Sequence, residues 1–111
     1  MARKAERCQS PEKVVDDTII LKRPRRGAKL REEVWQMADG EVTKYNLAHI
    51  NHLVCRVDNG RVLGYDNSHD GHHRHVMGNV EPVEFTDFQS LAKRFQDEVR
   101  ELWRREDEQE G

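Results

Sequence analysis

Four of the six histidines of this chain fall within seven positions, between residues 69 and 75. They belong to the run Tyr65-Asp66-Asn67-Ser68-His69-Asp70-Gly71-His72-His73-Arg74-His75. A hydrophobic core has no use for such a cluster, because imidazole is costly to bury without hydrogen-bonding partners. Histidine changes its charge near neutral pH and is the commonest metal ligand. The run therefore indicates an acid–base site, an anion-binding site, a metal site or a solvated loop.

The spacing of His73 and His75 favours an acid–base pair. On a β-strand these two side chains point to one side, while His72 and Arg74 point to the other. Cleavage of RNA without a metal needs a base for the 2′-hydroxyl, an acid for the 5′-oxygen and a cation at the phosphate. Imidazole suits the first two roles, so His73 and His75 are the predicted catalytic pair. Arg74 is a predicted phosphate ligand, and Asp66 is predicted to orient an imidazole.

Other basic side chains can bring a nucleic acid to this cluster. Residues 1–31 hold ten Lys and Arg against four Asp and Glu, whereas residues 81–111 hold five against ten. A basic front of this kind is typical of chains that meet polyanions, although two solvated flanks explain it equally well. The sequence-based candidates for nucleic-acid contact are Arg23, Arg25, Arg26, Arg61 and His72, with Arg61 as the alternative to Arg74 at the phosphate.

A metal site is the competing interpretation of the same residues. His73 and His75, together with Asp66 or His69, can supply three ligands and leave an open position, as catalytic zinc sites do. The spacing matches no zinc signature, because His-Glu-x-x-His and paired Cys-x-x-Cys motifs are both absent. In the acid–base interpretation no cofactor is expected, since a chain of this size has little room for a deep pocket.

The composition predicts one small domain with polar segments at both ends. The 111 residues are 36% charged and only 35% hydrophobic. We expect a flexible arm over residues 1–13, a single domain over 14–105 and an acidic, disordered tail over 106–111. Cys8 and Cys55 do not form a disulfide framework. No apolar stretch suits a membrane span or a signal peptide, so a cytoplasmic protein without membrane contact is expected.

The hydrophobic pattern predicts an antiparallel sheet before a terminal helix. The predicted strands are Val14–Lys22, Leu30–Met37, Glu41–Val57 with a bend within 46–51, Arg61–Asn67, His73–Val76 and an extended Val80–Phe85. Asp39-Gly40 and Asn59-Gly60 are the predicted hairpin turns. His49 and His52 fall in an apolar stretch and are interpreted as core or edge residues.

The end of the chain predicts an amphipathic helix. Thr86 followed by Gln89 has the spacing of a capping box. Apolar residues then recur at helical spacing, at Phe88, Leu91, Ala92, Phe95, Val99, Leu102 and Trp103. The predicted fold is therefore α+β: an antiparallel sheet of four to six strands with one C-terminal amphipathic helix packed on one face.

The order of these motifs resembles a known family. Tyr65-Asp66-Asn67, then His72-His73-Arg74-His75, then Gly78 and an amphipathic helix are similar to the TumE-type toxins of bacterial and archaeal toxin–antitoxin pairs, over roughly residues 62–103. The resemblance implies a small cytoplasmic toxin with a helix-turn-helix antitoxin as partner, acting on RNA as a ribonuclease. The residues themselves also allow a non-catalytic module that binds protein or nucleic acid, a metal-binding protein and a homodimer.

Overall fold

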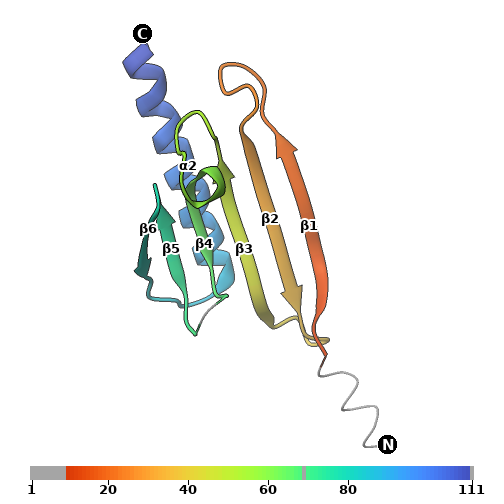
Figure 1. Ribbon diagram of the computed structural model, residues 1–111. Helices are drawn as coiled ribbons and strands as arrows, with labels where there is room; N and C mark the ends of the chain where they lie inside the picture. Colours follow the sequence, from red (N-terminus) through yellow and green to blue (C-terminus); the bar gives the residue numbers. More distant parts are fainter. Residues whose placement is uncertain (1–9, 69, 111) are drawn as a thin grey trace, which may run out of the picture.

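The strands form a single antiparallel sheet in chain order, as Figure 1 shows. The computed structural model describes residues 10–68 and 70–110. These residues contain six strands: β1 (Glu12–Ile20), β2 (Lys29–Gln36), β3 (Val42–Ile50), β4 (Arg61–Asp66), β5 (His73–Val76) and β6 (Asn79–Pro82). Each strand pairs with the next one along the chain. The predicted α+β class and the antiparallel sheet are confirmed.

One helix, α2 (Phe88–Glu110), covers part of one face of the sheet. It packs on β3 and β4, while β1 and β2 extend beyond it (Figure 1). The core between helix and sheet contains Tyr45, Leu47, Leu63, Tyr65, Leu91, Phe95 and Val99. We call the opposite face of the sheet, which no described helix covers, the open face. No helix among the described residues is long and apolar enough to cross a membrane.

The helix begins one residue later than its predicted cap. Asp87, not Thr86, accepts a hydrogen bond at Oδ1 from the backbone N–H of Ser90, at 2.8 Å. The Ser90 hydroxyl returns a bond to Asp87 Oδ2 at 3.1 Å. The carboxylate is the stronger cap because it also carries a negative charge at the positive end of the helix dipole.

The predicted strand Glu41–Val57 is too long, because β3 ends at Ile50. Asn51 stops the ladder by folding the chain back on itself. Its side-chain Oδ1 accepts from the N–H of Leu53, and its carbonyl accepts from Cys55. Asn59-Gly60 is likewise not a two-residue hairpin turn: it ends the loop 51–60 in a 3-10 turn (Asp58–Gly60), where Asn59 has a φ of 55°.

The predicted disordered tail from residue 106 differs from the structure, in which α2 continues to Glu110. Arg25, in the turn between β1 and β2, supplies the reason. Its guanidinium donates to the carbonyl of Trp103 at 2.8 Å and to Asp107 at 3.0 Å, and its Nε lies 3.4 Å from Glu106. It also lies over the Trp103 ring. The acidic end is therefore held by one residue of the basic turn.

This contact predicts different effects for two neighbouring arginines. Arg25→Ala should lower the free energy of unfolding by about 1–2 kcal/mol, because it removes a charge-assisted hydrogen bond and a cation–π contact. Arg26→Ala should change it by less than about 0.5 kcal/mol, because Arg26 is exposed. Urea unfolding of both variants measures the difference. Equal values would mean that the turn does not hold the helix end.

Candidate functional site

The strand register divides the histidine segment between the two faces of the sheet. In the β4–β5 pair, Asp66 lies opposite His73, Gly64 opposite His75, and Tyr65 opposite Arg74. Tyr65 belongs to the core under α2, so residues that alternate with it point away from the helix. Asp66, His73 and His75 therefore share the open face, and the strand alternation had predicted this for His73 and His75.

A carboxylate lies between the two imidazoles. Asp66 Oδ2 is 3.0 Å from His75 Nε2, and Asp66 Oδ1 is 4.0 Å from His73 Nδ1. The His75 contact is close but not aligned as a hydrogen bond, because Nε2 has no hydrogen-bonding partner among the described residues. Of the two imidazoles His73 is the more exposed, at 23% against 12% for His75. A ligand on the open face can reach His73 more easily.

Arg61 is the centre of a cluster on the open face, whose other members are Asp58, Asp66, His73 and His75. Its guanidinium donates to both oxygens of Asp58, at 2.9 and 3.0 Å, and to Asp66 Oδ2 at 3.2 Å. Burial alone would lower the pKa of Arg61, but the ion pairs with Asp58 and Asp66 outweigh burial and raise it above its usual value. Sequence reasoning missed Asp58. The available signal was its position three residues before Arg61, in a turn that precedes a strand.

Arg61 also fixes the tautomer of His75. Arg61 Nη2 lies 3.1 Å from His75 Nδ1, and a guanidinium can only donate. Nδ1 must therefore accept, which leaves the proton of a neutral His75 on Nε2, facing Asp66. The arrangement is a neutral imidazole between a guanidinium and a carboxylate, beside a second and more exposed imidazole.

Arg74 and His72 lie on the helix side, away from this cluster. Arg74 donates to Glu98 and to Glu81, each at 2.8 Å, and these pairs raise its pKa although burial opposes them. His72 stacks on Phe85 with a centroid distance of 3.9 Å. Arg61 therefore takes the position beside the imidazoles for which the sequence had offered Arg74 or Arg61.

The match to a known family now adds to this geometry. A family model described as "Toxin TumE" matches residues 5–103, which is most of the chain. The chain belongs to the TumE toxin family. It is thus related to toxins of toxin–antitoxin systems, and a cognate antitoxin is the implied partner. No curated protein and no solved structure gives a significant match.

The other predicted contact residues of this TumE-family chain are not part of the cluster. Arg23, Arg25 and Arg26 lie in the turn between β1 and β2, and Arg25 is occupied by the end of α2. His69 lies outside the described residues. His49 is fully buried and accepts a hydrogen bond from Trp103 Nε1 at 3.2 Å, in agreement with its interpretation as a core residue.

The described part of the cluster is arranged around an arginine and not around a set of metal ligands. No three His, Cys, Asp or Glu side chains converge as ligands in residues 10–68 and 70–110. The guanidinium of Arg61 fills the space between Asp58 and Asp66, where a cation would find its carboxylate ligands. A metal would therefore have to displace a bound arginine.

The inward-facing histidines predict a loss of stability in acid. Burial lowers the pKa of both His49 and His72 below the ordinary value of 6.5. The unfolded chain then binds more protons than the folded one, so the free energy of unfolding should fall as the pH drops below about 6.5. His49→Gln keeps an acceptor for Trp103 and should reduce this slope. Urea unfolding between about pH 5 and 8 measures it, and an unchanged slope would contradict the assignment.

Proposed function

We propose that this toxin cleaves RNA without a metal ion, through His73 and His75 on the open face. The observation that carries the proposal is the convergence of two imidazoles, a carboxylate and a guanidinium at one point on the open face of the sheet. His73 and His75 are the acid–base pair, Asp66 orients an imidazole, and Arg61 binds the phosphate. These are the groups that transesterification at an RNA phosphate requires.

The reaction uses the 2′-hydroxyl of the substrate as its nucleophile. A neutral imidazole takes the hydroxyl proton while the 2′-oxygen forms a bond to phosphorus. The bond from phosphorus to the 5′-oxygen breaks, and an imidazolium protonates that leaving oxygen. The products are a 2′,3′-cyclic phosphate and a free 5′-hydroxyl. A guanidinium beside the phosphate stabilises the charge that develops on its non-bridging oxygens.

Arg61 links phosphate binding to the availability of His75. In the free toxin its guanidinium is shared among Asp58, Asp66 and His75. Asp58 is the more exposed of the two carboxylates, at 25% against 10% for Asp66. A phosphate can replace Asp58 as the partner of Arg61. The same movement frees Nδ1 of His75 for proton transfer.

The test is a cleavage assay in chelator. Full-length toxin, freed of its antitoxin, is incubated with a short RNA and with the same oligonucleotide carrying 2′-deoxyribose at the cleaved position. We expect cleavage of the RNA, a 2′,3′-cyclic phosphate end and no cleavage of the deoxy substrate. A requirement for a divalent ion would support the metal interpretation instead. No cleavage by the antitoxin-free toxin would support a non-catalytic interaction module.

Gly64 predicts an indirect effect on the same reaction. It lies opposite His75, and a Cβ at this position would meet Arg61 Cδ at 2.5 Å and the carbonyl oxygen of Leu47 at 3.0 Å. Gly64→Ala should therefore move Arg61 and lower the cleavage rate, by up to about 100-fold for a displacement of about 1 Å. The cleavage assay measures the rate, and circular dichroism checks the fold. A full rate in a folded variant would show that Arg61 has no defined position in the reaction.

A further inference from the structure

The helix side of the β1–β2 hairpin has no covering layer among the described residues. α2 packs on β3 and β4, and Figure 1 shows β1 and β2 extending past it. Ile19 pairs with Leu30 in the register, and Leu30 pairs with His49, which contacts α2 through Trp103. Ile19 therefore faces the helix side, yet its side chain is 57% exposed. On this uncovered strip of the sheet face, the exposed Ile19 lies beside the partly buried Leu30 and offers apolar surface on which a partner can pack.

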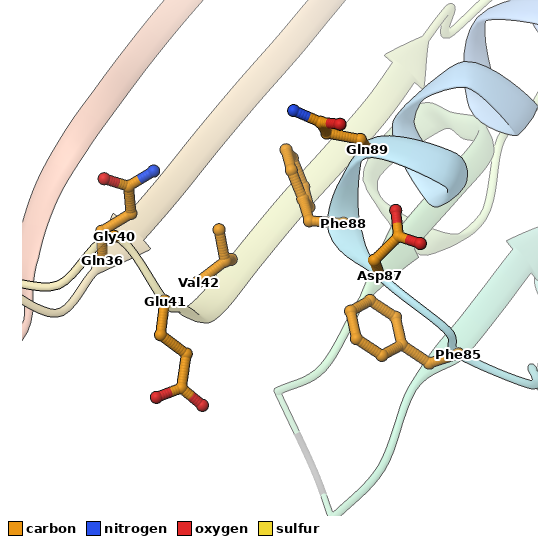
Figure 2. Close-up of a pocket in the computed structure, with 8 residues that line it drawn as sticks. All are labelled: Gln36, Gly40, Glu41, Val42, Phe85, Asp87, Phe88 and Gln89. Carbon is orange, nitrogen blue, oxygen red and sulfur yellow. The ribbon is translucent and has the colours of Figure 1, made fainter.

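Two hollows flank α2 along this strip. The first has a volume of about 150 Å³ and is lined by apolar side chains from both layers, among them Ile19, Leu30 and Phe95. The second has a volume of about 610 Å³ and opens between the β2–β3 turn and the start of α2, with Val42 and Phe88 on its walls. Figure 2 shows this second hollow. We call the strip with its two hollows the hairpin groove.

The size of the hairpin groove suits one helix. Leu30 lines one hollow and Gln36 the other, and the six-residue span between them along β2 corresponds to about 20 Å. A helix of about 13 residues has this length. The apolar side of the bound helix would lie beside α2 and cover the exposed side chain of Ile19.

The unpaired charge in the groove is negative and lies on the same face as its apolar side chains, because Asp17 pairs with Glu32 two residues along the strands from the pair of Ile19 with Leu30. Asp17 and Glu32 line the first hollow and Glu41 the second, and none of the three has an ion-pair partner in the described part of the chain. Arg31 is the cation that lines the first hollow, and it is already paired with Asp16 and Glu33. The groove therefore complements a helix that carries Lys or Arg side chains next to its apolar ones.

We infer that the hairpin groove binds an amphipathic helix of the cognate antitoxin, apolar on one side and flanked by Lys or Arg. Family membership implies the partner, and the apolar side chains together with the unpaired acidic ones select its chemistry. A second copy of the chain fits less well. A two-fold dimer places the same patch on both sides of the interface, so Asp17 and Glu32 would meet acidic residues. This inference does not rest on RNA cleavage.

Two neighbouring isoleucines provide a matched test. Ile19 faces the groove and Ile20 the open face, and their side chains are 57% and 64% exposed. Each is replaced by Arg in the full-length toxin, which is titrated with the purified cognate antitoxin. Ile19→Arg should raise the Kd by at least about 30-fold, because it places a charge in the apolar contact, while Ile20→Arg should leave it within about threefold. Charge reversal of Asp17 and Glu32 to Lys should slow association and reduce its salt dependence.

Hydrogen exchange shows where the antitoxin binds, and light scattering tests whether a second toxin chain occupies the groove instead. In the wild-type complex, exchange should slow in residues 29–36 and 88–96, and the free toxin should be monomeric. If both isoleucine variants raised the Kd for the antitoxin equally, the antitoxin would bind at the edge of β1, and the proposal would be overturned. An unchanged Kd for Ile19→Arg would also overturn it, as would a toxin dimer that Ile19→Arg separates without affecting antitoxin binding.

Discussion

Replacing His73 with Ala is expected to lower the rate of RNA cleavage by about 10²- to 10⁴-fold, the usual contribution of a general acid or base. His73 is the more exposed imidazole of the cluster, and Asp66 is its charged neighbour at 4.0 Å. Because the side chain lies on the open face rather than in the core, the fold should survive. Single-turnover cleavage in chelator measures the rate, and thermal unfolding checks stability.

The control for this substitution is His52→Ala. His52 is an exposed imidazole in the loop between β3 and β4, outside the cluster. Its removal should leave the rate within about threefold, since distant surface groups contribute little. The wild-type rate should follow a bell-shaped pH profile, because one imidazole must be neutral and the other charged. A His73→Ala variant that cleaves at the wild-type rate would rule out His73 as a catalytic residue.

Replacing Arg61 should affect both catalysis and stability. Arg61→Ala removes the guanidinium from the phosphate, which should lower the cleavage rate by at least about 100-fold. It also leaves Asp58 and Asp66 without their shared partner, at a cost of about 2 kcal/mol in the free energy of unfolding. Arg61→Lys keeps the charge but loses the fork that reaches both carboxylates, so it should restore stability only in part.

Arg56→Ala is the matched control for Arg61. Arg56 is exposed, in the loop between β3 and β4. Its removal should change neither the cleavage rate nor the stability beyond experimental error. A stable Arg61→Lys variant with the full rate would mean that only a positive charge is needed. If Arg61→Ala lost stability but kept its rate, the residue would be purely structural.

The amino-acid sequence alone predicted the elements and one important pairing of side chains. Alternating apolar residues and the Asp39-Gly40 turn indicated the antiparallel sheet, and the stripe from Phe88 to Trp103 indicated the helix. Strand periodicity also placed His73 and His75 on one side. These predictions succeed because they depend on local geometry, in which side chains alternate along a strand and recur every three or four residues along a helix.

Local geometry could not say which side of the sheet the helix covers or what lies across the strands. Only the tertiary structure shows that Arg74 binds Glu98 while Arg61 reaches His75. The long predicted strand and the disordered tail differed from the structure for the same reason. The turn at Asn51 and the contact of Arg25 with the end of α2 depend on backbone hydrogen bonds and ion pairs between distant segments. Such contacts carry no local periodic signal, so the tertiary structure alone decides them.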